Sequence, residues 1–246
     1  VIVPAHTWVS DISSVIQCGF EPVFVDINLK TLGMNRDKVF EAISENTRAV
    51  FFSHIQGFNG FNTEFLERLD DQRIKLIEDV CESHGATHCN QKLGSFGWMS
   101  NFSFYYAHHM STIEGGMVCT NDTEVYSKLR MLRSHGMVRE SGDQALEEKW
   151  ASDFPDLNPQ FIFAFPSYNV RNTEIGAVLG LSQLKRLDEN NRRRSKNLNR
   201  FLSTINSEKF LTDFYTEGSC NYAFNLILRE ADSNFMRRVF SALDQN

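Results

Sequence analysis

Short apolar runs rich in β-branched residues alternate with helical patterns along the first 80 residues. This alternation limits the possible folds more than any other feature of the chain. The apolar runs lie at residues 1–4, 22–26, 49–55 and 74–79, with helical patterns at 8–20, 35–47 and 62–71. Short buried strands separated by helices are typical of an α/β fold with a mostly parallel sheet and helices on both faces.

Later segments predict a hairpin, a loop between two strands and a long helix. The hairpin spans 85–97, the strands 101–106 and 115–121, and helices are expected at 123–136, from about Thr173 to 205, and at 233–243. We expect residues 138–167, with three prolines, to be irregular, and 221–228 to begin a strand. The predicted division is a large domain at 1–172 and a connecting helix with the start of a small C-terminal domain at 173–246.

Charge and cysteine usage exclude several classes of protein. The 25 basic and 31 acidic residues of the 246 give a net charge of −6, which disfavours nucleic-acid binding. Five cysteines without CxxC spacing indicate reduced thiols in a cytoplasmic protein, and no signal peptide or membrane span is evident. The chain starts without Met inside a strand, so we expect a piece of a longer protein, truncated at both ends.

Polar residues follow three of the predicted strands. His6-Thr7-Trp8 follows the first, His54 belongs to the end of the third, and Asp79 ends the fourth. Ligands of open α/β sheets bind at the carboxyl ends of the strands, so this pattern predicts a site. By residue type alone, Asp79 is either a ligand-facing acid or a helix N-cap, with Glu82 completing a capping box or reaching the same site. Trp8 is either a core residue or a stacking platform.

The segment "FSFYYAHHMSTIEGGM" holds two adjacent histidines, His108 and His109. Adjacent residues of a strand point to opposite faces, and no HxxxH or HxH spacing is present, so we expect no metal site. A neutral histidine in a crevice suits proton transfer, although residue type alone favours a structural histidine. Ser103 could bind phosphate, and "YNVR" at 168–171 could bind an anion.

Together these motifs resemble a known family. The stretches "VIVPAHTWVSDISSVIQCGFEPVFVDINLKTLGMN", "IEDVCESHGA", "KLGSFG", "FSFY", "EGGMVCTND", "LRMLRSHGM" and "YNVRNTEIGAVLGLSQLKRL" are similar to those of the DegT/DnrJ/EryC1/StrS sugar aminotransferases. The resemblance implies the type I fold of enzymes that use pyridoxal 5′-phosphate (PLP). That fold has a seven-stranded, mostly parallel sheet and a small C-terminal domain, and it forms a homodimer with active sites shared between the subunits.

The resemblance also assigns roles to five residues. Asp79 matches the acid that pairs with the pyridine nitrogen, and Trp8 matches the aromatic residue that stacks on the ring. Glu82 stands where aminotransferases usually have Gln. Ser103 matches a phosphate ligand. Asn169 matches the residue that reaches the phosphate in the neighbouring subunit.

One position departs from the sugar aminotransferases, because His108 stands where they carry the catalytic lysine. Imidazole cannot form a Schiff base, so ordinary aminotransfer is not expected. The double histidine resembles the keto-sugar 3-dehydratase branch of the family, which implies that His108 is the catalytic acid and base. Supporting or substrate-contacting roles are expected for a further set: His109, His6, His54, Glu114, His135 and Arg171.

The resemblance therefore implies removal of the C3 hydroxyl of a nucleotide-linked 4-keto-6-deoxy sugar. The expected substrate is GDP-4-keto-6-deoxymannose, with L-glutamate converting PLP to pyridoxamine phosphate (PMP), in dideoxy-sugar synthesis for a surface polysaccharide. Three alternatives stay open: a nucleotide-sugar 4-aminotransferase, an iron–sulfur-dependent CDP-keto-sugar 3-dehydrase and a non-enzymatic protein of this fold. An iron–sulfur cluster needs several cysteines, including a closely spaced pair, and this sequence has no such pair.

Overall fold

The chain is built on one six-stranded sheet with strand order β2-β1-β3-β4-β7-β8. The computed structural model describes residues 1–245. β1 (Ile2–Pro4), β2 (Val23–Val25), β3 (Ala49–Ser53), β4 (Lys75–Asp79) and β7 (Met99–Ser103) pair in parallel, and β8 (Gly116–Thr120) pairs antiparallel to β7. The predicted mostly parallel α/β fold is confirmed.

Helices follow the strands in the predicted order, with one further helix, α5, that was not predicted. They are α1 (Val9–Gln17), α2 (Arg36–Ala42), α3 (Thr63–Asp71), α4 (Thr123–Leu132), α5 (Gln144–Asp153), α6 (Glu174–Thr204) and α7 (Ser233–Asp244). The hairpin predicted at 85–97 forms from β5 (Thr87–His88) and β6 (Gln91–Lys92). Short 3-10 turns occupy Ile55–Gly57, Val138–Glu140 and Pro159–Phe161.

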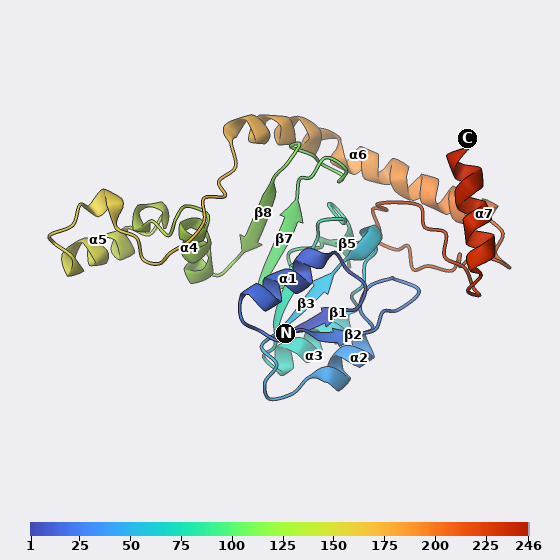
Figure 1. Cartoon of the computed structure of the whole chain (residues 1–246), viewed down its shortest axis with the longest axis horizontal. Helices are drawn as coiled ribbons and strands as arrows, with labels where there is room; N and C mark the ends of the chain where they lie inside the picture. Colours follow the sequence, from blue (N-terminus) through green and yellow to red (C-terminus); the bar gives the residue numbers. More distant parts are fainter. Residues whose placement is uncertain (246) are drawn as a thin grey trace.

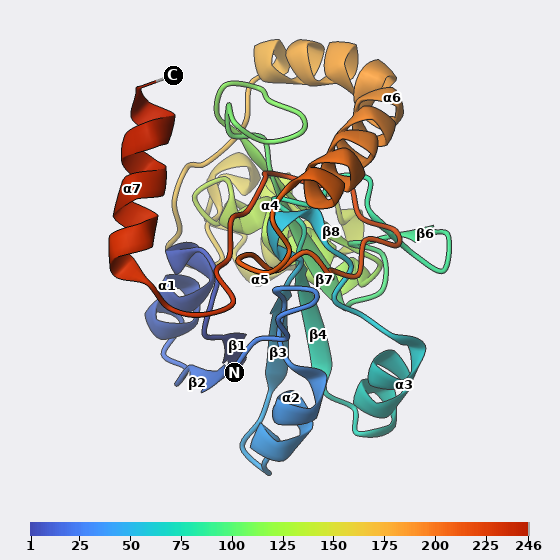
Figure 2. The ribbon, with the colours of Figure 1, turned by 90° about the vertical axis from the view of Figure 1, so that its right-hand side faces the viewer.

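Alternating side chains of the strands bury both faces of the sheet. Ile2, Val50 and Phe52 join one core cluster with residues of α2 and α3, including Val39 and Phe65. The intervening residues, Val3 and Phe51, pack on the other face against Val15 and Ile12 of α1. Because successive side chains of a strand point to opposite faces, these apolar runs need helices on both sides. Figure 2 shows α1 on one side of the strands and α3 on the other.

Residues 138–167 are not irregular throughout, contrary to the prediction. α5 forms there before the first of the three prolines, Pro155, with Asp143 as its N-cap, whose side chain accepts a hydrogen bond from the Leu146 amide. No residue of α5 is buried. Its sequence therefore has no apolar stripe, and local capping rather than periodicity marks the helix. Figure 1 shows α4 and α5 beyond β8, away from the helices that cover β1 to β4.

The strand predicted at 221–228 is also wrong. This segment makes only an isolated bridge, between Leu228 and Phe210. An alternating pattern becomes a strand only where a second strand supplies backbone partners, and within residues 1–245 none lies alongside. The sheet holds six strands in this part of the chain, where the resemblance implies seven. β8 forms an open edge, at which Met117 and Val118 are nearly half exposed.

The segment that follows α6 returns to the sheet. Arg194 of α6 donates hydrogen bonds to the backbone carbonyls of Asn221 and Tyr222, and Ser195 donates to that of Ser219. Cys220 donates its backbone N–H to Gly57, just after β3. These contacts hold residues 219–222 above the carboxyl ends of the strands, while α7 lies at the far end of α6 (Figure 1).

The division into domains at 1–172 and 173–246 stays a prediction. Asn246, the last residue of the second domain, lies outside the described residues. Within residues 1–245, every helix is too short or too polar to cross a membrane.

Candidate active site

A cleft of about 430 Å³ opens at the carboxyl ends of β1, β3, β4 and β7. This edge is where the sequence places its polar residues, because all the parallel strands end there. Its lining is Thr7, Trp8, Ser10, Ser53, His54, Ile55, Asp79, Cys81, Glu82, Ser103, Tyr105, His108, Glu114 and Tyr222. The structure therefore brings Trp8, Asp79, Glu82, Ser103 and His108 to one cavity.

Asp79 provides a buried carboxylate in this cleft. It is the last residue of β4, and its Oδ1 accepts hydrogen bonds from the Cys81 amide at 3.0 Å and the Asn101 side-chain amide at 2.9 Å. The Cys81 bond closes the turn after β4, but no helix begins there, so Asp79 is not the helix N-cap that one of its interpretations predicts. Burial raises the pKa of Asp79, and its hydrogen bonds with Cys81 partly oppose that rise.

A second carboxyl, that of Asp11, faces Asp79 from the first turn of α1. Asp11 is only 2% exposed, and its Oδ2 accepts hydrogen bonds from the hydroxyls of Thr7 and Ser53, each at 2.6 Å. Ser53 is the Cα partner of Asp79 across β3 and β4. Burial, followed by the charge of Asp79, raises the pKa of Asp11 to about 7. The site therefore holds a coupled pair of carboxyls.

His108 lies in the turn after β7, with its ring beside Tyr222 and Tyr105. The ring centroids are 5.4 and 5.7 Å from that of His108. Burial lowers the pKa of His108, so the imidazole is neutral near pH 7. Its Nδ1 is buried without a hydrogen-bond partner. A neutral imidazole at a cavity wall can accept or deliver a proton.

His109 points away from the cleft into the protein. It is buried, and its Nε2 lies 3.2 Å from the Asn221 carbonyl and 3.4 Å from that of Cys220. Only a protonated Nε2 can donate to these carbonyls, which fixes the tautomer of the ring. Burial, then the nearby charge of Arg194, lowers the pKa of His109 to about 4. His109 therefore ties the His108 turn to the segment after α6.

Glu82 lies at the wall of the cleft near the backbone of Gln56. Its Oε2 accepts a 2.6 Å hydrogen bond from the Gln56 amide, and burial raises its pKa. Gln56 has a φ of 58°, a left-handed conformation that turns its amide toward the carboxylate. Ser103, at the end of β7, accepts from the Tyr105 amide at 3.2 Å. Trp8 is 73% exposed, with its ring available to a ligand.

His54 has a structural partner instead of a free ring. Its Nε2 is 3.4 Å from Oε2 of Glu78, and both side chains are fully buried. Glu78 also accepts hydrogen bonds from the amides of Gly94, Phe96 and Gly97 at 2.6–2.8 Å. This pair fixes the loop before β7 beneath the cleft.

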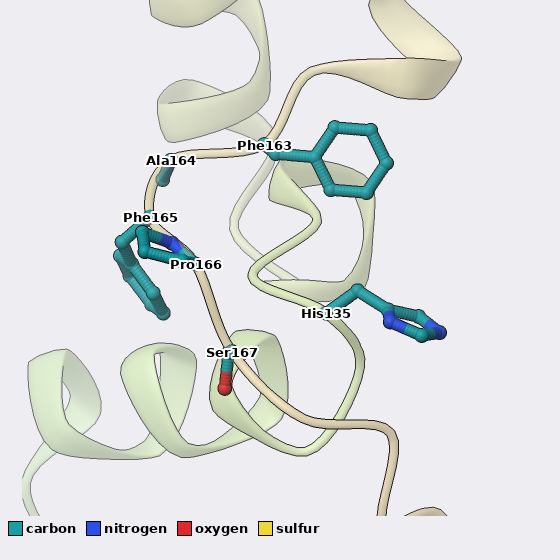
Figure 3. Close-up of a pocket in the computed structure, with 6 residues that line it drawn as sticks. All are labelled: His135, Phe163, Ala164, Phe165, Pro166 and Ser167. Carbon is teal, nitrogen blue, oxygen red and sulfur yellow. The ribbon is translucent and has the colours of Figure 1, made fainter.

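The remaining predicted residues lie outside the cleft or at its rim. Glu114 lines the cleft and is exposed, whereas His6 is exposed and absent from the lining. His135 belongs to a separate hollow with residues 163–167, and Figure 3 shows its ring pointing away from Phe165 and Pro166. Asn169 and Arg171 are exposed and contact each other, Arg171 Nε donating to Asn169 Oδ1 at 3.0 Å.

Asp11, which faces Asp79, and Tyr222 are among the residues of the site that sequence reasoning missed, together with Ser10, Ser53 and Tyr105. Asp11 lies one turn from Val15 on the buried face of α1, so a carboxylate within an apolar stripe was the available signal. Tyr222 comes from a segment remote in sequence, and no local pattern marks it. Among residues 1–245, no three His, Cys, Asp or Glu side chains are grouped so as to hold a metal ion.

A family model covers nearly the whole chain. The DegT/DnrJ/EryC1/StrS aminotransferase family matches residues 1–245. The chain belongs to this family. Relatives include GDP-4-keto-6-deoxy-D-mannose 3-dehydratase of Escherichia coli, 33% identical over 97% of this chain and 61% of the relative. GDP-perosamine synthase of Caulobacter vibrioides is 34% identical over 77% of this chain and 46% of the relative.

Solved structures of similar proteins have the same fold. The E. coli 3-dehydratase with bound hydrated PLP superposes with a TM-score of 0.84 at 28% identity, over 99% of this chain and 63% of that chain. Helicobacter pylori PseC, an aminotransferase, superposes with a TM-score of 0.81 at 22% identity, over 99% of this chain and 62% of that one. The chain spans about three fifths of the length of the 3-dehydratase relatives.

Proposed function

We propose that the protein is a PLP- and PMP-dependent dehydratase that removes the C3 hydroxyl of a nucleotide-linked 4-keto-6-deoxy sugar. The observation that carries this proposal is the position of His108 in the same cleft as Asp79, with no lysine in the lining among the described residues. Two similar curated proteins, each 33% identical, are GDP-4-keto-6-deoxy-D-mannose 3-dehydratases, which supports GDP-4-keto-6-deoxymannose as the substrate.

The polar groups of the cleft fit PLP. Asp79 offers a buried carboxylate to a protonated ring nitrogen, exposed Trp8 offers an aromatic face, and Ser103 offers a hydroxyl to a phosphate. Bound PLP would supply an electron sink for bond cleavage next to the sugar ketone. A related structure with a PLP-glutamate geminal diamine, 29% identical to this chain, supports L-glutamate as the amino donor.

The absence of a lysine from this lining separates dehydration from aminotransfer. The closest lysines in sequence to His108 are Lys92, on β6, and Lys128, on α4, and neither lines the cleft. A lysine amine is the group that anchors PLP covalently in aminotransferases. Without it, the residues of the cleft would hold the cofactor by non-covalent contacts alone, which suits a reaction that consumes one amino group in each cycle.

His108 has the properties that a proton carrier needs. Its pKa is lowered by burial, so it is neutral and could accept a proton from a group bound in the cleft. The resulting imidazolium can then protonate the C3 hydroxyl as it leaves. Tyr222 and Tyr105 flank the ring and limit its rotation. One group in one position therefore serves as base and then as acid.

The overall reaction balances with glutamate as reductant. The sugar and L-glutamate give the 3-deoxy-4-keto sugar, 2-oxoglutarate and ammonia. Carbon 3 of the sugar is reduced as its hydroxyl leaves in water, and the α-carbon of glutamate is oxidised. The oxygen gained by 2-oxoglutarate comes from water, so no further oxidant or reductant is needed.

The test is mass spectrometry of the sugar after incubation of the protein with PLP, L-glutamate and GDP-4-keto-6-deoxymannose. A product lighter by one oxygen, formed with stoichiometric ammonia, is the expected result. An amine in place of the ketone would establish aminotransfer and overturn the dehydratase proposal. An unchanged sugar together with unchanged glutamate would overturn the proposed substrate and reaction.

The proposal also includes the assembly state of the protein and its location in the cell. We infer a cytoplasmic homodimer in which the partner subunit completes each active site, because Asn169 and Arg171 are exposed and lie outside this chain's own cleft. Sedimentation of the protein with and without PLP measures the assembly state. A monomer that binds PLP and turns over would contradict the shared site.

A further inference from the structure

Asp11 carries a buried carboxyl for which the proposed reaction has no assigned role. Its Oδ2 forms a closed triangle with the hydroxyl oxygens of Thr7 and Ser53. Two sides of the triangle, from Oδ2 to each hydroxyl, are 2.6 Å, and the third, between the hydroxyls, is 2.8 Å. All three separations are hydrogen-bond distances between oxygens.

The number of hydrogens in this triangle indicates the state of Asp11. Each hydroxyl has one hydrogen, so Thr7 and Ser53 together can form two of the three bonds. The third bond needs a hydrogen on Asp11. An ionised Asp11 would leave two oxygens at 2.8 Å with no hydrogen between them. A protonated Asp11 allows each oxygen of the triangle to donate one hydrogen bond and accept one.

The electrostatic surroundings of Asp11 agree with this count. Its place in the first turn of α1 and its two hydroxyl donors favour the ionised form. Burial and the adjacent Asp79 oppose ionisation and outweigh them, which raises the pKa of Asp11 to about 7. Cys81 and Glu82, from the turn after β4, are the other titratable groups facing the pair, and neither adds positive charge.

We propose that Asp11 is a positioning residue that holds one proton in the ligand-free site, so that Asp79 is the single ionised carboxyl offered to a protonated ring nitrogen. This inference rests on the proposed use of PLP and adds to it a group that sets the charge of the binding pair. A pair with both carboxyls ionised would repel each other, and a pair with both neutral would not attract the cationic ring.

Cofactor binding then becomes linked to a proton. A cationic ring beside Asp79 offsets the charge that keeps Asp11 protonated, and so lowers the pKa of Asp11. Below pH 7, binding therefore expels a proton and tightens as the pH rises; above pH 7 this dependence ends. Each unit by which the ring lowers the pKa of Asp11 changes the affinity ~10-fold across this range.

The first experiment measures the proton directly and needs no cofactor. Infrared spectra of the protein at pH 6 should contain the C=O stretch of a buried protonated carboxyl, and this band should disappear as the pH rises past 7. Asp11→Asn should remove the band. Asp37→Asn, at the exposed first turn of α2, is the matched control and should leave it. Asp79 and Glu82 also have raised pKa values, so the comparison is the spectrum of wild type minus that of Asp11→Asn. The absence of the band from this difference spectrum overturns the inference.

The second experiment measures PLP affinity from pH 5.5 to 8.5 by cofactor absorbance. The ratio of the dissociation constants of wild type and Asp11→Asn should change several-fold up to pH 7 and stay constant above it. Asp37→Asn should follow wild type throughout. If the dissociation constants of wild type and Asp11→Asn have the same pH dependence, the positioning role is overturned and the dehydratase proposal stays intact. An Asp11 infrared band in a protein that binds no PLP would overturn the proposed function while supporting the bound proton.

Discussion

The ring of Tyr222 lies 5.4 Å from the imidazole of His108, measured between centroids and at an interplanar angle of 34°. Tyr222 reaches this position because Arg194 of α6 donates to its carbonyl at 3.0 Å. The contact thus links the turn after β7 with the segment that follows α6 in the chain. The orientation of the proposed acid and base depends on this distant tyrosine.

Removing the tyrosine ring should therefore impair turnover more than cofactor binding. We expect Tyr222→Ala to lower kcat ~100-fold, because the imidazole loses the wall that orients it. Tyr222→Phe keeps the ring and should retain most of the activity. Steady-state kinetics and PLP titration separate the two effects. Tyr126→Ala, at an exposed position of α4, is the control, and an equal loss there would contradict the explanation.

Replacing His108 by Asn should remove the proton carrier and keep the cleft. We expect dehydration to fall ~10²–10⁴-fold, the usual contribution of a positioned acid or base. PLP affinity should change little, because Asp79, Trp8 and Ser103 remain. Ammonia release and PLP absorbance measure the two quantities. His88→Asn, outside the cleft, should leave both unchanged, and a fully active His108→Asn would exclude the proposed role.

His84 should make stability depend on pH. Its ring is 2% exposed beside His108 and His109, and burial, then the charges of these histidines, lowers its pKa to about 3. The folded state therefore binds fewer protons than the unfolded chain between pH 6.5 and 3. Stability contributed by neutral His84 is complete above pH 6.5 and is lost as the pH falls, by about 1.4 kcal/mol per pH unit at most.

The measurement is urea unfolding of wild type and His84→Leu at pH 7, 6 and 5. The variant should lose less stability than wild type over this range. Asp11, with its raised pKa, acts in the opposite sense in both proteins, so the difference between the two slopes isolates His84. Exposed His6→Leu should keep the wild-type slope. Equal slopes for all three proteins would show that His84 can be protonated without cost in the fold.

Alanine substitutions at two glycines compare the cost of backbone strain alone with the cost of backbone strain plus a steric clash. Gly19 ends α1 with a φ of 77°, and a side chain there would meet no atom within 4 Å. Gly136 has a φ of 79°, but a Cβ there would collide with the carbonyl oxygen of Phe165. We expect Gly19→Ala to cost about 1 kcal/mol of stability. Gly136→Ala should cost a further ~1–3 kcal/mol, measured by thermal unfolding. Equal losses would mean that residues 163–167 move away freely.

Local patterns predicted most of the elements that build the sheet. β-branched runs marked β1 to β4, and α1, α3, α4, α6 and α7 formed where the helical period placed them. The failures have a common cause. α5 lies in the segment that ends in three prolines and lacks an apolar stripe, and residues 221–228 have the alternation of a strand but no strand beside them. In both, the outcome depends on capping or on partners outside the segment.

For the candidate site too, the sequence predicted which residues reach the cleft but not how every side chain is oriented. Asp79, Ser103 and Trp8 lie at or just after strand ends, so the topology of a parallel sheet gathers them into one cleft. His54 follows the same rule in sequence, yet its side chain turns to Glu78 and its ring is buried. Position along the strand decides which edge a residue reaches, whereas its rotamer depends on neighbours that the sequence does not name.

The sequence by itself determined the order of the elements, the family and the chemical types that reach the cleft. It did so because hydrophobic periodicity and short motifs are local properties of the chain. Only the tertiary structure decided that Asp11 faces Asp79 and that Tyr222 flanks His108. Such contacts join distant segments, and the burial that follows sets the protonation of each group, a property that no residue has before the chain is folded.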